Sequence, residues 1–478
     1  MQHDAMRPAA LPVGPPDGGA LLAGADVAVL EGVRTVDGAV VDVEIAEGRV
    51  VAVADRGPRD LVAPESGSRA PAAERALAGE PALRLDASGW LVLPAACEPH
   101  AHLDKALTAA RFPAGTGEDL VGAVAQWREL VPHIDGADVL DRARTAVGRY
   151  AARGITTIRT HVDAPADGDP LRLLDALLTL REELAGSVTL QVCLLGGSQT
   201  PTEVFAEAAA RGVDALGGCP HLASDPRAEI TRVLDVAERT GLPVDLHADE
   251  RTALPDDGVL DVEELARQVI ARGLTQRVTA SHAVRLGSLP PERLAAVVGL
   301  VARAGLGVVT LPITNLYLQG RDATHLAPRG LTAVRALLDA GIPVAAGADN
   351  LRDPFNPAGS GDPFETTSLL MTAAHLSARE ALDAVTAGAR TVLGLPPAGL
   401  TVGHRADLVL VPDVPLGDVL AGGEHARVVL AAGRVVADTR VHRSLALGPA
   451  SRQAIPQSAR PSTRPAAPEL SAPEQLVR

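Results

Sequence analysis

The residues best suited to chemistry stand in the segment 98–105, which reads Glu-Pro-His-Ala-His-Leu-Asp-Lys. An apolar run, residues 90–96, precedes it and predicts a buried strand. Residues i and i+2 of a strand project to one face, so His100 and His102 should lie on the same side, about 6 to 7 Å apart at Cα. Two imidazoles placed in this way are suited to binding one metal ion.

Lys105 closes this segment and is the only lysine in the chain, in which every other cation among the 44 Lys and Arg residues is arginine. A lysine that persists beside a metal motif in such a composition indicates a role that arginine does not fill. The functional interpretation is an ammonium donor to a substrate carbonyl. The alternative is a surface salt bridge with Asp104.

Composition limits the classes of function. The 478 residues are 46 % hydrophobic and only 2 % aromatic, so a large core must be built from Ala, Val and Leu. The net charge of −15 argues against nucleic acid or an anionic membrane as a partner. Three cysteines without paired spacing, Cys97, Cys193 and Cys219, fit a reducing cytoplasm. No signal-peptide pattern and no apolar run of about 18 residues is present.

The two ends of the chain share a β-rich pattern. Short Val-rich runs separated by turn signals predict that residues 25–92 and 399–445 together form one small β-sandwich domain. Residues 57–82, rich in Pro, Ala, Glu and Ser, are predicted to be a loop insertion in it. Residues 1–24 and 446–478 are predicted to be disordered tails.

Residues 93–398 alternate between apolar strand patterns and longer helical patterns, such as 119–153 and 261–272. The predicted strands are 91–98, 155–161, 188–195, 213–218, 243–248, 277–282, 306–312 and 342–348. Eight βα units match a (β/α)8 TIM-type barrel, with a doubly wound sheet as the alternative. A barrel would place its chemistry at the C-terminal ends of the strands.

Histidines and one aspartate mark those predicted strand ends. They are His100 and His102 (first strand), His161 (second), His247 (fifth), His282 (sixth) and Asp349 (eighth). One such histidine alone is more often structural than a ligand, but their gathering at one rim favours a metal site. Neutral imidazoles with a carboxylate suit Zn²⁺ or Fe²⁺ and leave a coordination position for water.

With these residues in place, the chain resembles the amidohydrolase superfamily, and within it the cytosine deaminase-like branch, over roughly residues 85–440. The motifs that carry the resemblance are Glu98-Pro99-His100 with His102-Leu103-Asp104, Arg159-Thr160-His161-Val162-Asp163, His247 with Asp249-Glu250, Leu318-Gln319-Gly320-Arg321, and Asp353-Pro354 with Pro357. The sequence His-Leu-Asp-Lys is similar to that of amino-triazine hydrolases of this branch.

The resemblance implies a ligand set of His100, His102, His247 and Asp349 for one divalent ion per chain, Zn²⁺ or Fe²⁺. Dinuclear members bridge two ions with a lysine on strand 4, and this chain has no lysine there. The ion would lower the pKa of its water to give hydroxide near neutral pH.

The resemblance also implies three catalytic residues. Asp349 would take the proton of the water, and His282 would hydrogen-bond the metal-bound hydroxide or the substrate group under attack. Glu250 would protonate a ring nitrogen and then the leaving amine. The simpler interpretation of Glu250 is a solvated carboxylate at the start of a helix.

Four positions depart from cytosine deaminases and are candidate substrate contacts. Gly197 stands where the family has a glutamine that binds the edge of the base, and Asn350 stands where it has a second aspartate. Phe355 replaces a tryptophan that stacks on the base. Lys105 stands where cytosine deaminases often have threonine. Loss of a hydrogen-bonding reader changes specificity by orders of magnitude, which argues against cytosine itself.

The predicted function is cytosine deaminase-like hydrolytic deamination of a small heterocycle. Hydrolysis of an N-alkylamino-triazine or a cyclic amide is the first alternative, and a non-catalytic barrel scaffold is the second. The expected partner is a small heterocyclic substrate, with no nucleic acid and no membrane, and a homo-oligomer is left open. The expected location is the cytoplasm.

Overall fold

A computed structural model describes residues 23–56, 83–113, 117–321, 324–325, 328–421 and 425–441. Three of the predicted segments lie outside the described residues: the N-terminal tail apart from its last two residues, the loop insertion 57–82 and the C-terminal tail 446–478.

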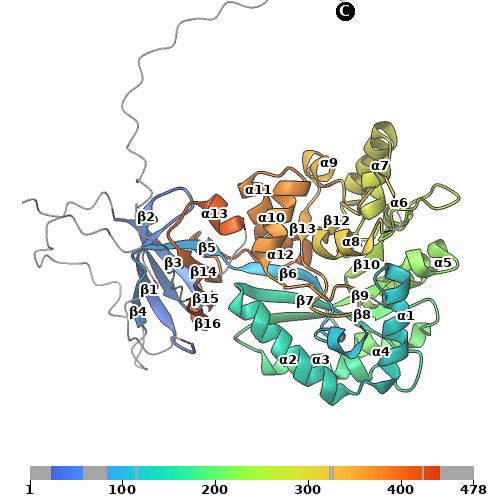
Figure 1. Cartoon of the computed structure of the whole chain (residues 1–478), viewed down its shortest axis with the longest axis horizontal. Coiled ribbons are helices and arrows are strands. Elements are labelled where there is room, and N and C mark those ends of the chain that lie inside the picture. Colours follow the sequence, from blue (N-terminus) through green and yellow to red (C-terminus); the bar gives the residue numbers. More distant parts are fainter. Residues whose placement is uncertain are drawn as a thin grey trace, which may run out of the picture. The chain divides into compact units, whose positions relative to one another are not determined.

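Eight parallel strands follow one another in chain order in the first sheet (Figure 1). They are β6 (Ala96–Ala101), β7 (Ile155–Asp163), β8 (Thr189–Gly196), β9 (Ala215–Gly218), β10 (Val244–Ala248), β11 (Val278–His282), β12 (Gly307–Thr310) and β13 (Val344–Ala346). A parallel bridge between Ala101 and Asp349 brings the end of the last strand back to the first. The sheet is therefore a (β/α)8 barrel, as predicted, and not a doubly wound sheet.

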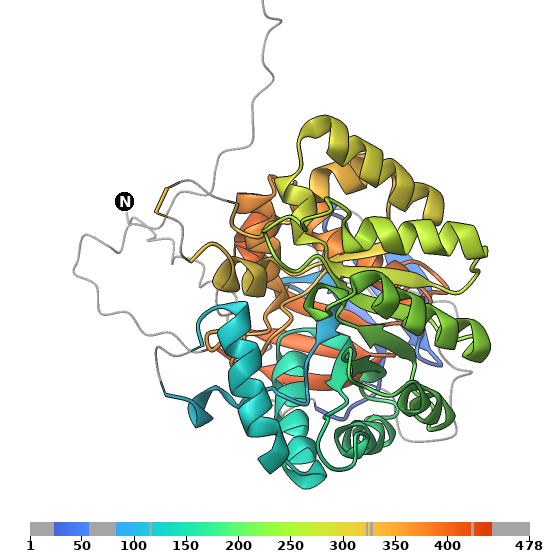
Figure 2. The ribbon, with the colours of Figure 1, turned by 90° about the vertical axis from the view of Figure 1, so that its right-hand side faces the viewer.

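Helices cover the outside of these strands (Figure 2). The α-helices are α1 (Leu120–Leu130), α2 (Gly136–Ala152), α3 (Arg172–Glu183), α4 (Thr202–Ala210), α5 (Pro226–Thr240), α6 (Asp261–Arg272), α7 (Pro291–Ala304), α8 (Pro312–Leu318), α9 (Val334–Asp339), α10 (Pro363–Ala373), α11 (Ala378–Val385) and α12 (Ala387–Leu393). Their inward faces bury mainly Ala, Val and Leu, which confirms the aliphatic core expected from the scarcity of aromatic residues. The barrel strands are thus joined to their helices mainly through aliphatic side chains.

The second sheet joins the two ends of the chain. Its strands are β1 (Val27–Arg34), β2 (Val40–Ala46), β3 (Arg49–Asp55), β4 (Leu83–Asp86), β5 (Trp90–Pro94), β14 (Leu408–Pro412), β15 (Arg427–Ala431) and β16 (Arg434–Thr439). They are ordered β16-β15-β14-β5-β1-β2-β3, and β4 pairs with β1. Its core combines Leu30 and Val43 with Leu410 and Leu430, so both ends fold together into the predicted small β domain. A short helix, α13 (Leu416–Leu420), links β14 to β15.

Two predicted elements are wrong in their bounds. The apolar run 90–96 is not one strand, because β5 ends at Pro94 in the small sheet and β6 begins at Ala96 in the barrel. Both strands are buried, so their apolar residues merge and only the proline marks the break. The helical pattern 119–153 is likewise two helices, α1 and α2, separated by a 3₁₀ turn at Val131–His133.

Among the described residues no helix combines the length and the apolar character needed to cross a membrane. The cytoplasmic location and the domain boundaries given above remain predictions.

Candidate active site

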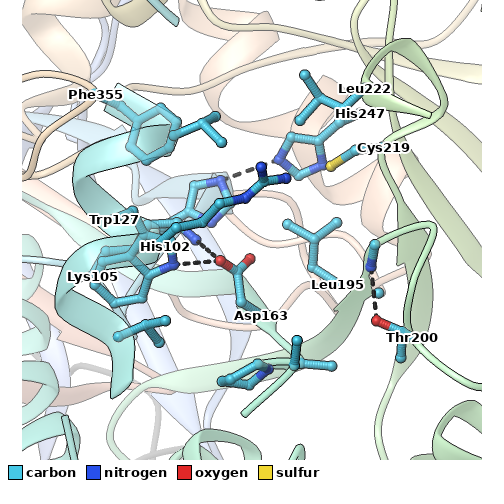
Figure 3. Close-up of a pocket in the computed structure, with 18 of the residues that line it drawn as sticks. His102, Lys105, Trp127, Asp163, Leu195, Thr200, Cys219, Leu222, His247 and Phe355 are labelled. Carbon is cyan, nitrogen blue, oxygen red and sulfur yellow. Dashed lines mark hydrogen bonds and ion pairs between the residues drawn. The ribbon is translucent and has the colours of Figure 1, made fainter. Parts of the chain in front are cut away.

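The predicted site residues gather at one cavity of about 450 Å³ at the C-terminal ends of the barrel strands. Those that line it are His102, Lys105, Gly197, His247, Glu250, His282, Asp349, Asn350 and Phe355. His100 is the exception, and its Nε2 lies 3.0 Å from Nε2 of the lining residue His247. Figure 3 shows His102 and His247 with Lys105, Trp127 and Phe355 around this cavity.

Three imidazole nitrogens converge at the base of the cavity. Nε2 of His247 lies 3.0 Å from Nε2 of His100 and 3.2 Å from Nε2 of His102. Nε2 of His102 is in turn 3.4 Å from Oδ1 of Asp349. His100 and His102 therefore share a face at the end of β6, as their i, i+2 spacing predicts.

This donor set fits a divalent cation. Burial, reinforced by neighbouring histidines or Lys105, holds the pKa of His100, His102 and His247 well below the usual range, so the rings are neutral and offer lone pairs. Three nitrogens that close together cannot satisfy one another by hydrogen bonds. Oδ1 of Asp349 is buried and has no hydrogen-bond partner among the described residues. A shared cation satisfies all four groups at once.

The surroundings of Asp349 disfavour an ionised carboxylate. Burial raises its pKa well above the usual range, and the carboxylates of Glu250, Asp353 and Glu98 raise it further. Its φ of 70° lies in the left-handed region, which non-glycine residues rarely adopt. The carboxylate of Glu98 accepts a hydrogen bond from the backbone N–H of Ala348 at 2.8 Å and so ties the last strand to the first. A carboxylate kept under such conditions indicates a functional group.

Glu250 lies between two histidines. Its Oε2 is 3.1 Å from Nε2 of His221 and 4.0 Å from Nε2 of His282. Burial opposes ionisation, but these two rings outweigh it and lower the pKa of Glu250 to about 2. Gln319 donates to the backbone oxygen of Glu250 at 2.7 Å and fixes its position. Glu250 is thus a buried carboxylate and not a solvated one, as the simpler interpretation had it.

His282 projects into the same cavity from the end of β11. Its Nδ1 lies 3.0 Å from Oδ1 of Asn315, and donation to that oxygen leaves Nε2 with the lone pair. Nε2 is buried and has no hydrogen-bond partner among the described residues. The ring therefore offers an acceptor toward the cavity.

Lys105 is buried and forms two ion pairs. Its Nζ lies 2.8 Å from Asp163 and 3.4 Å from Asp104, and only 3 % of the side chain is exposed. Burial alone would lower the pKa of Lys105, but the two carboxylates outweigh it and hold the pKa above the usual value. The ammonium also lies 4.9 Å from the ring centre of Trp127 and 5.8 Å from that of Phe355. The pair with Asp104 exists, but it is not the surface pair considered above.

The other candidate contacts stand on the cavity wall. Gly197 directly follows β8, and a Cβ added there would meet no atom within 4 Å. Asn350 donates to Asp353 at 2.8 Å, which orients its amide. Phe355 is partly buried beside Lys105. The structure brings these predicted residues to one cavity. Their contacts to a substrate remain a prediction.

Several residues of the site were not found from the sequence alone. His221 lies three residues beyond the end of the predicted strand 213–218, and this position is the sequence signal that marks it. Asn315 and Trp127 come from helices α8 and α1, where no strand-end pattern marks them. His161 was noted at its strand end but does not line the cavity: its ring stacks on His100 at 3.9 Å, and its Nε2 lies 3.6 Å from Asp245.

Comparisons with known proteins agree with this geometry. The sequence model described as the amidohydrolase family matches residues 113–437. A pterin deaminase from Rhizobium rhizogenes is 32 % identical over 74 % of this chain and 82 % of its own length. The crystal structure of 5-methylcytosine deaminase from Klebsiella pneumoniae superposes with a TM-score of 0.75 at 26 % identity, covering 87 % of this chain and 100 % of that one.

A third similar structure is N-isopropylammelide isopropylaminohydrolase from Burkholderia multivorans, with a TM-score of 0.68 at 28 % identity, covering 86 % of this chain and 98 % of that one. Together these similarities confirm the predicted superfamily and its deaminase-like branch, and with them a metal-dependent hydrolase of C–N bonds in small heterocycles. The chain belongs to the amidohydrolase family.

Proposed function

We propose that this amidohydrolase removes the exocyclic amino group of a cyclic amidine in a fused two-ring heterocycle of the pterin kind and releases ammonia. The observation that carries the proposal is the open wall at Gly197, where an added Cβ would meet no atom within 4 Å. A cavity of about 450 Å³ has room for two fused rings, and the missing side chain at Gly197 leaves space for the second ring on this wall. The similarity to a pterin deaminase supports the same substrate class.

We propose that one divalent ion per chain, Zn²⁺ or Fe²⁺, is held by His100, His102, His247 and Asp349. When bound, such an ion lowers the pKa of a water molecule and supplies a nucleophile near neutral pH. The only lysine of the chain follows the first barrel strand, so no lysine of the fourth strand is available to bridge a second ion.

The residues around the reacting carbon divide the proton transfers. The carboxylate of Asp349 accepts one proton of the attacking water, and its Oδ1 has no hydrogen-bond partner among the described residues. Nε2 of His282 accepts a hydrogen bond from the same water, because Nδ1 is committed to Asn315. Glu250, which is ionised at rest, accepts the other proton of the water and delivers it to the ring nitrogen beside the reacting carbon. It then relays the proton held by Asp349 to the departing amine.

The candidate binding residues hold the ring system. Phe355 offers a face for stacking, and Lys105 and Asn350 offer hydrogen-bond donors. Gly197 contributes space instead of a side chain. Because few polar side chains can bond the substrate and these are held in place, the site should discriminate strongly between substrates whose ring edges differ in donors and acceptors.

A substrate panel tests this function. The purified protein, reconstituted with zinc or iron, is incubated with pterin, cytosine and N-isopropylammelide, and ammonia, isopropylamine and product mass are measured. We expect ammonia and the oxo product from pterin, with a larger kcat/KM than for cytosine. A larger kcat/KM for cytosine, or release of isopropylamine alone, would contradict the proposal.

The Gly197→Gln variant tests the open wall directly. It should lower kcat/KM for pterin by about tenfold or more, because the new side chain occupies the space of the second ring, and leave cytosine turnover unchanged or higher. Gly148→Gln on the exposed face of α2, where a Cβ also meets no atom within 4 Å, is the matched control and should change neither value.

A further inference from the structure

Asp163 presents one carboxylate oxygen to the cavity while its other oxygen is fixed. Oδ2 accepts hydrogen bonds from Nε1 of Trp127 at 2.5 Å and from Nζ of Lys105 at 2.8 Å, as Figure 3 shows. No described residue forms a hydrogen bond to Oδ1, and 25 % of the side chain is exposed in a residue that lines the cavity. A carboxylate oxygen left open in a preorganised group is an acceptor available to a ligand.

Lys105 is fixed just as firmly. Asp104 is fully buried, and its two oxygens accept from the backbone N–H groups of Lys105 at 2.9 Å and Asp163 at 3.0 Å. The ammonium contacts both carboxylates and also lines the cavity. An ammonium has three hydrogens, so two ion pairs leave one donor for a ligand.

The two groups thus stand side by side, one accepting and one donating. β8 pairs with β7, the strand that ends at Asp163, and Gly197, which directly follows β8, has no side chain to bond a substrate. Two carboxylates around one ammonium leave a net negative charge, which favours a ligand N–H at the exposed oxygen. An N–H beside a carbonyl, as in a lactam edge, complements this arrangement.

We infer that Asp163 and Lys105 together bind the lactam edge of the substrate, with Oδ1 of Asp163 accepting the ring N–H and Nζ of Lys105 donating to the adjacent carbonyl. Trp127 acts as a positioning residue, because its indole N–H holds the carboxylate of Asp163 in place. The inference rests on the proposed deaminase function and names the ring edge that the site selects. It also assigns the reading of the substrate to β7 instead of to the position of Gly197.

The test that needs no variant uses N-methylated pterin, in which a methyl group replaces the lactam N–H. With the wild-type holoenzyme, kcat/KM for the methylated compound should fall by about 10²-fold or more relative to pterin, since the exposed oxygen loses its donor and meets a methyl group. A kcat/KM within threefold of that for pterin would overturn the inference. Failure of the wild-type enzyme to release ammonia from any compound would overturn the proposed function instead.

The variant test compares Asp163→Asn with Asp167→Asn, which also lines the cavity but has no contact with Lys105 among the described ion pairs. Pterin and 2,4-diaminopteridine are the two substrates, because the diamino compound reverses the donor and acceptor of this edge. Asp163→Asn should lower kcat/KM for pterin by about 10²-fold and change that for the diamino compound by less than threefold. An equal loss on both substrates, or the same loss in Asp167→Asn, would show that Asp163 does not read this edge.

Discussion

At the scale of single residues, the decisive feature is the way Glu250 is surrounded. His221 approaches it with Nε2, while Nδ1 of the same ring lies 2.9 Å from the backbone oxygen of His247, so both ring nitrogens face acceptors. Although burial favours the neutral ring, the hydrogen bond and charge of Glu250 raise the pKa of His221. The carboxylate is therefore ionised, oriented and within reach of the cavity, so it can accept a proton from the attacking water before passing it to the substrate.

The Glu250→Gln variant should keep metal and fold but lose about 10² to 10⁴ in kcat, because the amide preserves shape and has no transferable proton. Steady-state ammonia release and metal analysis measure the two effects. Glu203→Gln, at an exposed position in the first turn of α4, is the control and should match wild type. Near-normal turnover in a metal-loaded Glu250→Gln protein would contradict the proton-transfer role.

The Lys105→Arg variant should lose much of kcat/KM without losing metal. The longer, planar guanidinium does not fit a buried position where one ammonium contacts two carboxylates and the ring of Trp127. Arg128→Lys, the exchange of the other cation on the described cavity wall, is the control. If Lys105→Arg and wild type turn over substrate equally, Lys105 does not contact the substrate.

Much of the site follows from the sequence because strand ends are recognisable. His100, His102, His247, His282 and Asp349 each follow an apolar run, and parallel strands deliver such residues to one rim. Trp127 and Asn315 could not be found in the same way, because they reach the site from helices whose approach depends on tertiary packing. The burial of Lys105 was equally invisible, since it depends on Asp163, which lies 58 positions farther along the chain.

At the scale of elements, the loop between β10 and α6 connects the proposed metal ligand His247 and the proposed acid Glu250 to helix α6. Asp249 has a φ of 56° and its carboxylate accepts from the backbone N–H groups of Asp261 at 3.0 Å and Val262 at 2.8 Å. Arg285 donates to the same carboxylate at 3.1 Å. Asp249 therefore caps α6 from a distance and sets the direction in which Glu250 leaves the strand.

Asp249→Asn should lower the free energy of unfolding by about 3 kcal/mol, because it leaves the buried guanidinium of Arg285 without one of its carboxylates. Asparagine tolerates the left-handed backbone, so the loss reflects charge and not strain. Denaturant unfolding of the variant beside Asp256→Asn, an exposed change in the same loop, measures it. Equal unfolding midpoints for the two variants would refute the capping role.

The elements show where sequence patterns are insufficient. The period of the apolar residues identified α6 to the residue and most barrel strands to within a few residues. It could not separate β5 from β6, because both are buried on all sides and only Pro94 interrupts the run. Partners distant in sequence decide which sheet a strand joins, such as β14 for β5 and β7 for β6. The local sequence pattern of a strand does not identify these partners.

At the scale of the whole molecule, metal binding and folding should be coupled. The proposed ligands come from β6, β10 and the segment after β13, which are the first, fifth and last strands of the barrel. A cation shared by these elements binds only the folded chain, so it adds to stability by mass action. The bridge between Ala101 and Asp349 places one of these connections at the point where the barrel closes.

Removal of the metal with a chelator should lower the unfolding temperature, and re-addition of zinc or iron should restore it. At a free metal concentration 100 times the Kd, the expected gain is about 2.7 kcal/mol. The His102→Ala variant should unfold at one temperature with or without metal, since a ligand is missing. A metal-dependent shift of the same size in His102→Ala would place the ion elsewhere.

The most direct measurement is a titration of metal-free protein with zinc or iron, in which ammonia release from pterin and bound metal per chain are followed together. The account predicts that activity rises linearly and reaches its plateau at one ion per chain, and that His102→Ala neither retains the ion nor releases ammonia. Full activity without metal, a plateau at two ions per chain, or turnover by His102→Ala equal to wild type would contradict it.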